Sequence, residues 1–394
     1  MKYYPLNLGT LTKATFRERP NRFLIRCNTE KGEIEAYLPN PGRLWELLLP
    51  GATLYLSSNK APDLGQKVQR KTEYTAVAVE RYGSPIFLHT HLTNQVARYL
   101  IEARSIPSLE QAEIVREEVP YGRSRFDFLL NDNGGDLYLE VKSCTLFGNG
   151  VAMFPDAVTE RGRKHLRELA EMARKGMKTI ILFIIHYPHV NWFMPDFHTD
   201  YAFSKALLEA RHEARVISVA IEWKSDLSIG KEVKILEVPW GYLEGEVADR
   251  GSYLLVLGFE RDQLVRAGRL GSMPFQKGHY IYVGSAMTNL TARIERHKRM
   301  RKKEHWHIDY LTRAADSMVA LPIRSSRREE CSIAESLSSI LAHGPAGFGS
   351  SDCGCKSHLF WSKDNPLHAE AFHDVLQRYR MRHSWNKGER PLAV

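Results

Sequence analysis

The run TIILFIIHY at residues 179–187 constrains the fold more than any other part of this 394-residue chain. Residues 180–185 are all apolar, so an extended strand there has no polar side chain on either face and must be buried on both. Such a strand needs helices on each side of its sheet. Amphipathic helices are predicted at residues 93–103, 162–176 and 201–214, and a further strand at 216–223. The sequence therefore predicts an α/β domain that ends near residue 232.

The first ninety residues show a different pattern. Short runs of strand-forming residues are separated by turns rich in Pro and Gly, without a long helix between them. This pattern is typical of a small barrel, and an OB-like β-barrel is the predicted fold because that fold also binds nucleic acid. The predicted strands are RFLIRC at 22–27, GEIEAYL at 32–38, ATLYLS at 52–57, YTAVAVE at 74–80 and PIFLHT at 85–90.

The pattern changes again after residue 232. The stretch VKILEVPWGYLEGEVADRG mixes Pro and Gly and predicts a linker. Beyond it, two strands (GSYLLVLGF and KGHYIYVGSA) and two helices (TARIERHKRMRKK and SIAESLSSILA) predict a smaller α/β unit. The predicted organisation is an OB-like barrel at 1–90, an α/β domain at 91–232, a linker at 233–250, a second α/β domain at 251–365 and a tail at 366–394.

The net charge of the chain is +9, and it is unevenly distributed. Residues 245–394 contain 23 Lys and Arg against 16 Asp and Glu, which is +7. Residues 1–244 therefore contain 55 − 23 = 32 basic against 46 − 16 = 30 acidic residues, which is +2. Such an excess favours a polyanionic partner, nucleic acid first; a basic surface that only aids solubility is the alternative.

Neither a membrane span nor a leader peptide is predicted. No apolar run approaches the roughly 20 residues of a membrane helix, and the start MKYYPLNLGTLTK lacks the apolar core of a signal peptide. We therefore expect a cytoplasmic protein without a membrane partner. The five cysteines predict free thiols or a metal site, because a disulfide framework is not expected in a reducing compartment.

Residues 126–142, FDFLLNDNGGDLYLEVK, read as two strands joined by a polar turn, with charged residues among apolar ones. If these strands form a hairpin, Asp127 and Glu140 can project their carboxylates toward one point. Glu140 and Lys142 are two residues apart and share a face of their strand. Two carboxylates suit Mg²⁺ or Mn²⁺, and a lysine beside them can orient water and offset charge on a phosphate. We therefore expect Asp127 and Glu140 to be metal ligands and Lys142 to be a catalytic residue.

Asp127 followed by Glu140-Val141-Lys142 resembles the PD-(D/E)xK nuclease motif. The wider sequence resembles the sugar fermentation stimulation protein A family over about residues 1–232. The resemblance implies an OB-like N-terminal domain, a central restriction-endonuclease-like domain and DNA binding, but leaves cleavage open, since members of that superfold can bind without cutting. The runs that carry it are NPGRLWELLLPGA at 40–52, GRSRFDFLL at 122–130 and EVKSCTLFGNGVAMFPDAVTERGRKHLREL at 140–169.

A second group of candidate residues lies in the C-terminal part. GSYLLVL at 251–257 and HYIYVGSA at 279–286 place Tyr253 and Tyr282 in strands that we expect to be neighbours. Arg293 and His297 follow, four residues apart and therefore on one face of the next helix. Tyrosines in strands also pack simply as core residues, which is the alternative interpretation.

These residues, with HWHIDYL at 305–311 and GFGSSDCGCKSHLF at 347–360, resemble the GIY-YIG nuclease fold over about residues 246–365. The resemblance is to a small uncharacterised family of that fold. It implies that Tyr253, helped by His297, takes a proton from water while Arg293 steadies the phosphate charge. The motifs read GSY and YVG, and 29 residues separate the tyrosines, which predicts a loop insertion between the strands. The remaining roles implied are Tyr282 and Gly284 for the second motif and Glu335 for the metal-binding acid.

Residues 293–303 contain seven Lys or Arg and few acids. A solvated helix normally mixes charges of both signs, so this helix favours phosphate contact. The residues expected to contact nucleic acid are Arg296, Lys298 and Arg299 here, Gly284 of the second tyrosine motif, and Arg43, Arg123 and Arg125 in the first 232 residues.

Cys353 and Cys355, with Cys331, His343 and His358 within reach along the chain, form a candidate zinc site. Only one residue separates the paired cysteines, which is closer than the spacing commonest in structural zinc sites. The sequence therefore favours reduced thiols, with zinc as the alternative.

Two nuclease-like modules and a barrel on one chain favour a metal-dependent DNA endonuclease or phosphodiesterase that uses Mg²⁺ or Mn²⁺. The alternative is a DNA-binding regulator of sugar metabolism genes, in which the active-site remnants only grip phosphate. RNA is a less favoured partner than DNA. The acidic residues distinguish the two functions, because a cleaving site must hold its cation through Asp127 and Glu140, or through Glu335, whereas a binding module needs only basic residues.

Overall fold

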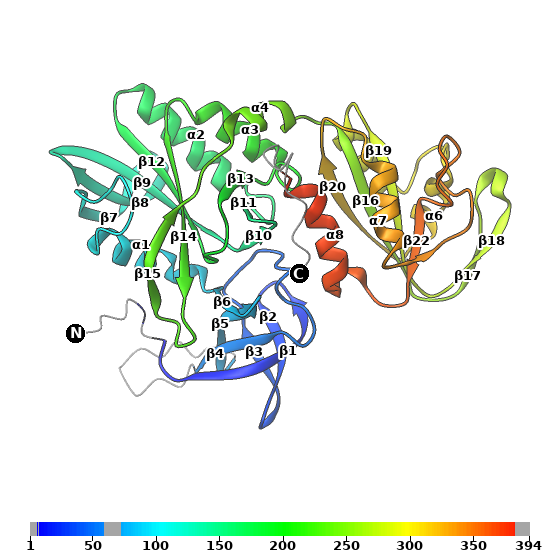
Figure 1. The fold of residues 1–394 in the computed structure, drawn as a ribbon, viewed down its shortest axis with the longest axis horizontal. Coiled ribbons are helices and arrows are strands. Elements are labelled where there is room, and N and C mark those ends of the chain that lie inside the picture. The colour runs from blue at the N-terminus through cyan, green and yellow to red at the C-terminus, as the bar shows by residue number, and fades with distance from the viewer. Residues whose placement is uncertain (1–5, 7, 59–71, 383–394) are drawn as a thin grey trace. The chain divides into compact units, whose positions relative to one another are not determined.

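The structure is a computed structural model that describes residue 6, residues 8–58 and residues 72–382. The chain divides into two compact units (Figure 1). Unit 1 comprises Met1–Asp196 and Ala202–Pro239, and unit 2 comprises Phe197–Tyr201 and Trp240–Val394. The sequence-predicted barrel and the first α/β domain both belong to unit 1. None of the helices in the described part of the chain combines the length and the apolar character that a membrane crossing requires.

The N-terminal part of unit 1 is the predicted OB-like barrel, blue in Figure 1. Its strand order is β3-β2-β1-β4-β5-β6, and a parallel pairing of β3 with β5 closes the barrel. The first strand was not predicted, because charged residues interrupt its apolar pattern and only Ala14 and Phe16 are buried. The strands are β1 (Leu11–Asn21), β2 (Leu24–Thr29), β3 (Gly32–Tyr37), β4 (Thr53–Ser58), β5 (Tyr74–Arg81) and β6 (Ser84–Phe87).

The second part of unit 1 is the predicted α/β domain. The apolar run that opened the sequence argument forms β12, which lies between β9 and β14 and runs parallel to both. The sheet order is β15-β14-β12-β9-β8-β7. Its strands are β7 (Glu113–Tyr121), β8 (Ser124–Asp132), β9 (Gly135–Cys144), β12 (Lys178–Ile185), β14 (Arg215–Trp223) and β15 (Ile229–Ile235), and its helices are α1 (Thr93–Glu102), α2 (Glu160–Arg174) and α3 (Tyr201–Ala210).

A two-residue turn joins β8 to β9 and confirms the predicted hairpin. Asp132 pairs with Gly135, so the turn consists of Asn133 and Gly134. Both have positive φ, 51° and 77°, which is the backbone of a type I′ turn and the reason for an Asn-Gly pair there. The turn therefore sets the register of the strands that carry Asp127 and Glu140.

The barrel and the sheet of unit 1 share one apolar core. Phe87 of the barrel stacks on Trp223 of β14, with ring centroids 4.4 Å apart. Leu100 of α1 and Leu139 of β9 belong to the same buried cluster. The elements not yet introduced are η1 (Thr90–Leu92) and a small sheet of β10 (Leu146–Gly148), β11 (Val151–Phe154) and β13 (Trp192–Pro195).

Unit 2 is built on a sheet of order β20-β16-β19-β22-β21, with a separate β17–β18 hairpin in the insertion predicted between the tyrosine strands. Its strands are β16 (Gly251–Phe259), β17 (Gln263–Arg266), β18 (Ser272–Phe275), β19 (Gly278–Ala286), β20 (Ser317–Arg324), β21 (Ala342–His343) and β22 (Leu359–Ser362). Its helices are α4 (Trp240–Glu246), η2 (Gly268–Leu270), α5 (Leu290–Lys298), α6 (His307–Ala314), α7 (Glu330–Ser338), η3 (Pro366–His368) and α8 (Glu370–Arg380).

Further stretches differ from the sequence prediction, and the predicted tail at 366–394 contains η3 and α8. The stretch predicted as a linker, residues 233–250, contains the end of β15 and all of α4. The basic helix, predicted to continue to residue 303, ends at Lys298. The residues that follow it are predominantly basic, and like charges one turn apart destabilise a helix.

Candidate functional site

Asp127 and Glu140 lie on the two strands of the β8–β9 hairpin. Backbone pairing ends at Phe128 and Leu139, one residue before the two acids. Beyond that point a side chain replaces the backbone pairing between the strands, because Asp127 Oδ2 accepts a hydrogen bond of 2.7 Å from the Val141 amide. Its Oδ1 accepts a second hydrogen bond, of 2.8 Å, from Asn94 Nδ2 on α1. The Asp127 carboxylate is thus fixed between α1 and β9.

Glu140 is the most deeply buried acid of this hairpin, with 3% of its surface exposed. Its Oε1 forms an ion pair with Lys142 Nζ and lies 2.6 Å from His165 Nδ1 on α2. Its Oε2 is buried and has no hydrogen-bond partner among the residues that the structure describes. An unsatisfied buried carboxylate oxygen is costly, so the site suits a ligand that brings positive charge to Oε2.

The surroundings drive the pKa values of these two acids in opposite directions. Burial raises the pKa of Asp127, and the neighbouring charge of Glu140 raises it further. Burial also opposes ionisation of Glu140, but Lys142 and His165 outweigh it and lower the pKa of Glu140. Two nearby acids whose pKa values are shifted in opposite directions by their surroundings are a recurrent feature of catalytic sites.

Asn94 and His165 complete this site and were not predicted. Both lie on the helices expected from the apolar pattern, α1 and α2, but neither belongs to a spacing motif. His165 is 4% exposed and faces Glu140, as expected for a histidine on the apolar face of a helix. Only the burial pattern of α2 could have indicated its direction.

The arginines expected to contact phosphate in unit 1 have different surroundings. Arg123 is exposed in the turn between β7 and β8. Arg125 is exposed on β8, 3.6 Å from Glu118. Arg43 is only half-buried, and its guanidinium carbon lies 5.1 Å from the centre of the Trp45 ring. Arg123 and Arg125 thus lie in the β7–β8 hairpin, whose second strand also carries Asp127.

In unit 2 the tyrosine strands are neighbours. The register of β16 and β19 sets Tyr253 opposite Gly284 and Leu255 opposite Tyr282, so the two tyrosines are diagonal on one face. Their ring centroids are 6.3 Å apart. A Cβ on Gly284 would lie 2.5 Å from the Tyr253 hydroxyl, so Gly284 is what allows the Tyr253 ring to lie against β19.

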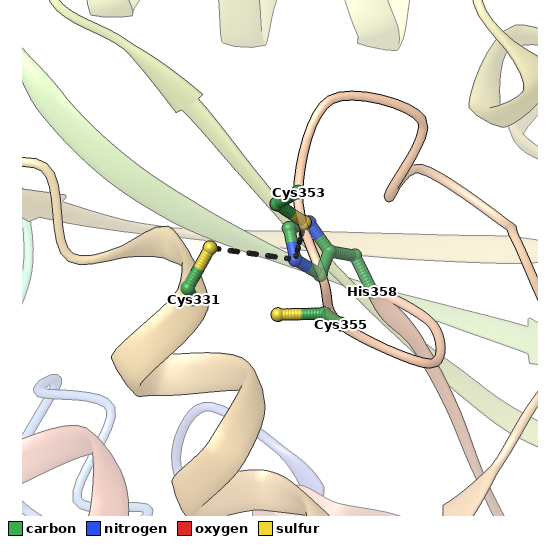
Figure 2. Close-up of side chains that lie close together, drawn as sticks. All are labelled: Cys331, Cys353, Cys355 and His358. Atoms are coloured by element: carbon green, nitrogen blue, oxygen red, sulfur yellow. Dashed lines mark hydrogen bonds between the residues drawn. The ribbon is translucent and has the colours of Figure 1, made fainter.

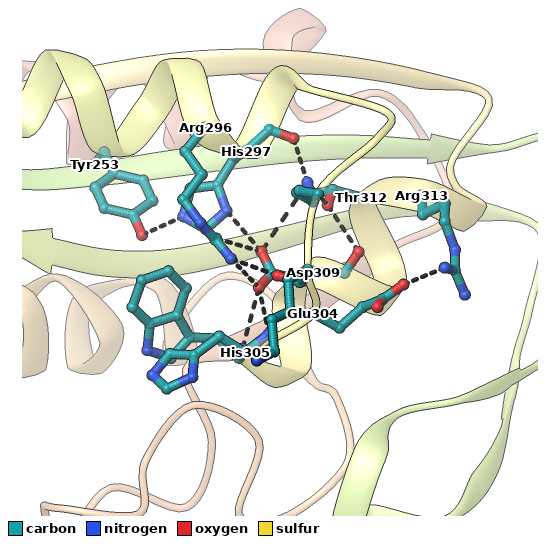
Figure 3. A network of polar contacts seen from close by, with 11 residues as sticks. Tyr253, Arg296, His297, Glu304, His305, Asp309, Thr312 and Arg313 are labelled. Atoms are coloured by element: carbon teal, nitrogen blue, oxygen red, sulfur yellow. Dashed lines mark hydrogen bonds and ion pairs between the residues drawn. The ribbon is translucent and has the colours of Figure 1, made fainter.

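His297 connects Tyr253 to a buried acid, as Figure 3 shows. The Tyr253 hydroxyl lies 2.9 Å from His297 Nε2, and Nδ1 of the same ring lies 3.4 Å from Asp309 Oδ1. Arg296 donates two hydrogen bonds of 2.9 Å to the Asp309 carboxylate. Burial raises the pKa of Tyr253 above its ordinary value, although Arg293 opposes this. Asp309 was not predicted, and as an acid within HWHIDYL it carried no motif signal.

Arg293 and the acids near the tyrosines are arranged partly as expected. The Arg293 guanidinium lies 4.1 Å from the centre of the Trp306 ring and lowers the pKa of Tyr253. The acids whose charge acts on Tyr253 and Tyr282 are Glu330 and Asp309. Glu335 is exposed on α7, where five residues correspond to about 140° around the helix axis from Glu330. The structure thus places Glu330, and not Glu335, beside the tyrosines.

The basic residues around α5 border an open hollow of about 450 Å³. Arg296 is held by Asp309, and Lys298 lies 2.6 Å from Glu295. Arg299 is exposed at the end of α5. The residues that line the hollow are Arg296, Arg299, Arg301, Lys302, Lys303, His305 and Trp306.

Four of the five candidate zinc ligands come together in unit 2. The ligand atoms of Cys331, Cys353, Cys355 and His358 all lie within 4.8 Å of one another. The fifth candidate, His343, is exposed on β21, and its ring packs 5.4 Å from the Phe360 ring.

Comparison with known proteins identifies each part of the chain. Residues 18–88 match the SfsA N-terminal OB domain, and residues 91–226 match the sugar fermentation stimulation protein RE domain. Residues 252–381 match a domain of unknown function, DUF123. The fold predicted for the first two domains is therefore confirmed, and the third is a separate α/β domain.

The chain matches relatives in other organisms over most of the length of each relative. A sugar fermentation stimulation protein homolog of Clostridium tetani is 38% identical over 230 residues, which is 57% of this chain and 97% of the relative. The homolog of Moorella thermoacetica is 41% identical over 203 residues, 51% of this chain and 85% of the relative. The structure of Pyrococcus furiosus SfsA in complex with Ca²⁺ matches with a TM-score of 0.53 and 28% identity, covering 60% of this chain and 99% of that one. The chain belongs to the sugar fermentation stimulation protein family.

Proposed function

We propose that this protein is a divalent-cation-dependent phosphodiesterase that acts on DNA, with its main active site at Asp127, Glu140 and Lys142. The observation that carries this proposal is the buried, unpartnered Oε2 of Glu140, next to a second carboxylate and a lysine. Most buried carboxylate oxygens have a hydrogen-bond partner, and a cation bound between the two acids would supply the one that Glu140 Oε2 lacks.

The donor set fits a hard cation. Asp127 and Glu140 supply carboxylate oxygens, which Mg²⁺, Mn²⁺ and Ca²⁺ all prefer. The structure of the Pyrococcus furiosus relative is described as a complex with Ca²⁺, which supports divalent cation binding in this family. A bound Mg²⁺ or Mn²⁺ would stabilise charge on the phosphate and lower the pKa of a water molecule.

The residues around the acids have separate roles in this proposal. His165 holds Glu140 Oε1, while Asn94 and the Val141 amide hold the Asp127 carboxylate. These contacts fix both carboxylates before substrate arrives. Lys142 exchanges its contact with Glu140 for one with the attacking water or the scissile phosphate.

DNA as the substrate is supported by charge and by fold. The chain has a net charge of +9, and exposed Arg123 and Arg125 lie on the same hairpin as Asp127. Positive charge near a catalytic site retains the phosphate backbone, and OB barrels bind nucleic acid strands. RNA presents the same phosphates, so it is included as a competitor in the test below.

A second candidate function is a DNA-binding regulator that does not cleave. The observation that favours it is the ion pair between Lys142 and Glu140, in which the lysine already neutralises the carboxylate that a cation would need. In that case the site contributes only to phosphate binding.

Unit 2 is a candidate second phosphodiesterase site of GIY-YIG type. Tyr253, His297 and Asp309 form a continuous polar chain, and Arg293 lies beside the tyrosine. In this proposal His297 receives the proton of Tyr253 and Asp309 stabilises the imidazolium. We assign the acid of this site to Glu330, because Glu330 acts on both tyrosines and Glu335 is exposed.

The test uses the full-length protein with labelled plasmid, branched DNA, single-stranded DNA and RNA, each with Mg²⁺, Mn²⁺ or EDTA. Cleavage of DNA only with metal supports the enzyme, whereas a salt-sensitive gel shift without products supports the regulator. Glu140→Gln tests unit 1 and Glu330→Gln tests unit 2, with Glu335→Gln as the exposed control. Loss of products in E140Q alone assigns the reaction to unit 1, and unchanged cleavage in E140Q would overturn that assignment.

A further inference from the structure

We propose that Cys331, Cys353, Cys355 and His358 form a zinc site in unit 2. Figure 2 shows the four side chains converging from two segments: Cys331 from the first turn of α7, and the other three from the loop that precedes β22. Three thiols and one imidazole are a recognised ligand set for structural zinc. This inference does not depend on the phosphodiesterase proposed for unit 1.

The distances between the ligand atoms fit a tetrahedral zinc. With Zn–S near 2.3 Å and Zn–N near 2.0 Å, a tetrahedron separates sulfur and nitrogen by roughly 3.5 Å and two sulfurs by roughly 3.8 Å. The Sγ of Cys353 lies 3.5 Å from His358 Nε2, and the Sγ of Cys331 lies 4.0 Å from the same atom. A shift of about half an ångström would bring the second pair to the coordination distance, and all four ligand atoms lie within 4.8 Å of one another.

The histidine is already oriented for a metal. His358 is 1% exposed, and its Nδ1 lies 3.2 Å from Glu330 Oε1. Its Nε2 is therefore the nitrogen directed toward the thiols. A carboxylate that holds the far nitrogen of a ligating imidazole is the usual second partner in zinc sites, where it fixes the tautomer and the ring orientation.

The cysteines are placed as ligands and not as a disulfide. All three are free thiols in the structure. The close Cys353-Gly354-Cys355 spacing, which favoured free thiols at the sequence level, is accommodated because no other atom crowds Gly354. Both thiols of this short loop segment can then face Cys331. The partly exposed position of the cysteines leaves a path for the ion to enter.

The proposed zinc would join α7 to the loop that packs against Tyr282. In that loop, the centroid of the Phe348 ring lies 6.2 Å from the centroid of the Tyr282 ring. A Cβ added to Gly349 would lie 2.7 Å from Cε2 of Tyr282. At the other end of this series of contacts, Ser285 Oγ on β19 donates a hydrogen bond to Glu330 Oε2. The ion would thus connect α7, β19 and the loop through His358 and Glu330.

The decisive experiment is metal analysis of the full-length protein. We expect about one zinc per chain, and Co²⁺ in place of zinc should give the visible absorption of a tetrahedral ion together with a thiolate charge-transfer band. Added Zn²⁺ should displace one equivalent of Co²⁺. A wild-type protein that takes up neither ion after reduction of its thiols would overturn the proposal, as would a cobalt spectrum without a thiolate band.

Variants assign the ligands. Cys331→Ser changes an exposed residue and is expected to lose the charge-transfer intensity of one thiolate and to bind zinc at least tenfold more weakly. His343→Ala is the matched control, because it removes an exposed histidine that lies in the chain between α7 and the loop with the other two cysteines. This variant should retain one zinc. Equal zinc content and equal spectra in the two variants would exclude Cys331 as a ligand and so contradict the four-residue site. Circular dichroism of both variants verifies that each is folded.

Discussion

Glu46 is a buried acid in the segment between β3 and β4 of the barrel, with 9% of its surface exposed. Burial raises its pKa from 4.5 to about 7, and the nearby charge of Asp156 adds to the effect, while Arg43 opposes it. The pKa of Asp156 is raised as well, again chiefly by burial. These residues therefore form a pH-sensitive group in unit 1 that is separate from the proposed active site.

The first prediction concerns the pH dependence of stability. Between pH 4.5 and about 7 the folded protein keeps the proton of Glu46 that the unfolded chain loses, so the free energy of unfolding falls as the pH rises through this window. Glu46→Gln should remove roughly 2–3 kcal/mol of this fall. Urea unfolding at pH 5 and pH 8 measures it, with exposed Glu110→Gln as control. Equal pH dependence in wild type and E46Q would contradict the prediction.

The second prediction concerns Gly284. An added Cβ would lie 2.5 Å from the Tyr253 hydroxyl and 2.9 Å from the Tyr282 ring, so the two rings would have to shift. Gly284→Ala should therefore reduce the free energy of unfolding by about 1–3 kcal/mol.

Gly241→Ala is the matched control for this change. Gly241 lies in α4, and among the described residues nothing beyond its chain neighbours and its own helix backbone lies within 4 Å of the added Cβ, so alanine there should be neutral or slightly stabilising. Thermal unfolding of the two variants measures both changes in stability. A G284A variant as stable as G241A would show that the two tyrosine rings can shift without a loss of stability.

At the scale of single residues, spacing identified part of each site. Asp127, Glu140 and Lys142 could be predicted because residue alternation in strands is regular, and the hairpin turn is visible in the sequence. Asn94 could not, because its contact with Asp127 depends on where α1 docks against the sheet. Glu330 could not be preferred to Glu335 either, since the helix register relative to the tyrosines is set by packing.

Helices α5 and α6 are joined through one buried carboxylate. Asp309 is fully buried, pairs with Arg296, and accepts hydrogen bonds from the amides of His305 and Trp306. Burial alone would raise its pKa, but these bonds, together with His297, lower the pKa far below its ordinary value. Asp309 thus connects α6 to α5 through its hydrogen bonds with Arg296.

The third prediction is that Asp309→Asn reduces the free energy of unfolding by about 3 kcal/mol or more, because it leaves Arg296 without its charged partner. The stabilisation by Asp309 is present above pH 3.8 and is lost as the pH falls toward its depressed folded pKa, so D309N should also be less sensitive to acid. Urea unfolding at pH 7 and pH 3.5 measures both effects.

Asp316→Asn provides the comparison for this element. Asp316 is exposed and accepts one hydrogen bond, from the Glu260 amide, so its replacement should change stability by less than about 1 kcal/mol. A D309N variant with the stability and the acid response of D316N would show that α5 and α6 are held mainly by apolar packing.

At the scale of elements, the spacing of apolar residues predicted most helices and strands. The elements that it did not predict correctly have physical explanations. The strand β1 was missed because its outward residues are charged and its inward ones few. Helix α4 lies in the stretch predicted as a linker, where Gly241 and Gly245 obscure the helical pattern. The early end of α5 reflects repulsion that the sequence displays, although periodicity alone does not reveal it.

Most of the net positive charge of the molecule, +7 of +9, lies in residues 245–394, where basic residues border the hollow beside α5. The fourth prediction follows from this distribution. Substituting Arg299, Arg301 and Lys303 by alanine should weaken DNA binding and reduce the slope of log affinity against log salt by up to about 0.9 for each phosphate that the variant no longer neutralises. Gel shifts or anisotropy at several salt concentrations measure the slope.

A control with the same change in charge is needed, because net charge alone alters association. Alanine at Lys277, Lys363 and Arg378, three exposed basic residues of unit 2 outside the hollow, provides it. Equal salt slopes in the two triple variants would assign DNA binding to the general field of the protein and not to the hollow.

For the molecule as a whole, the change of pattern near residue 90 and the apolar run at 179–187 predicted the barrel and the α/β domain, and the family comparison confirms both. Their association in one compact unit could not be predicted, because it depends on side chains from distant segments, such as Phe87 and Trp223, meeting in one core.

The Asn133-Gly134 turn has a consequence for how this protein can vary in length. One residue removed there would bring the apolar side chain of Val141 to the position of Glu140, and one residue added would bring that of Leu139 there. Either change would turn both acid and lysine toward the core. Insertions or deletions in this hairpin should therefore be tolerated only in pairs, unless a bulge absorbs the odd residue. A library of length variants at the turn would show this as an alternation between active and inactive proteins.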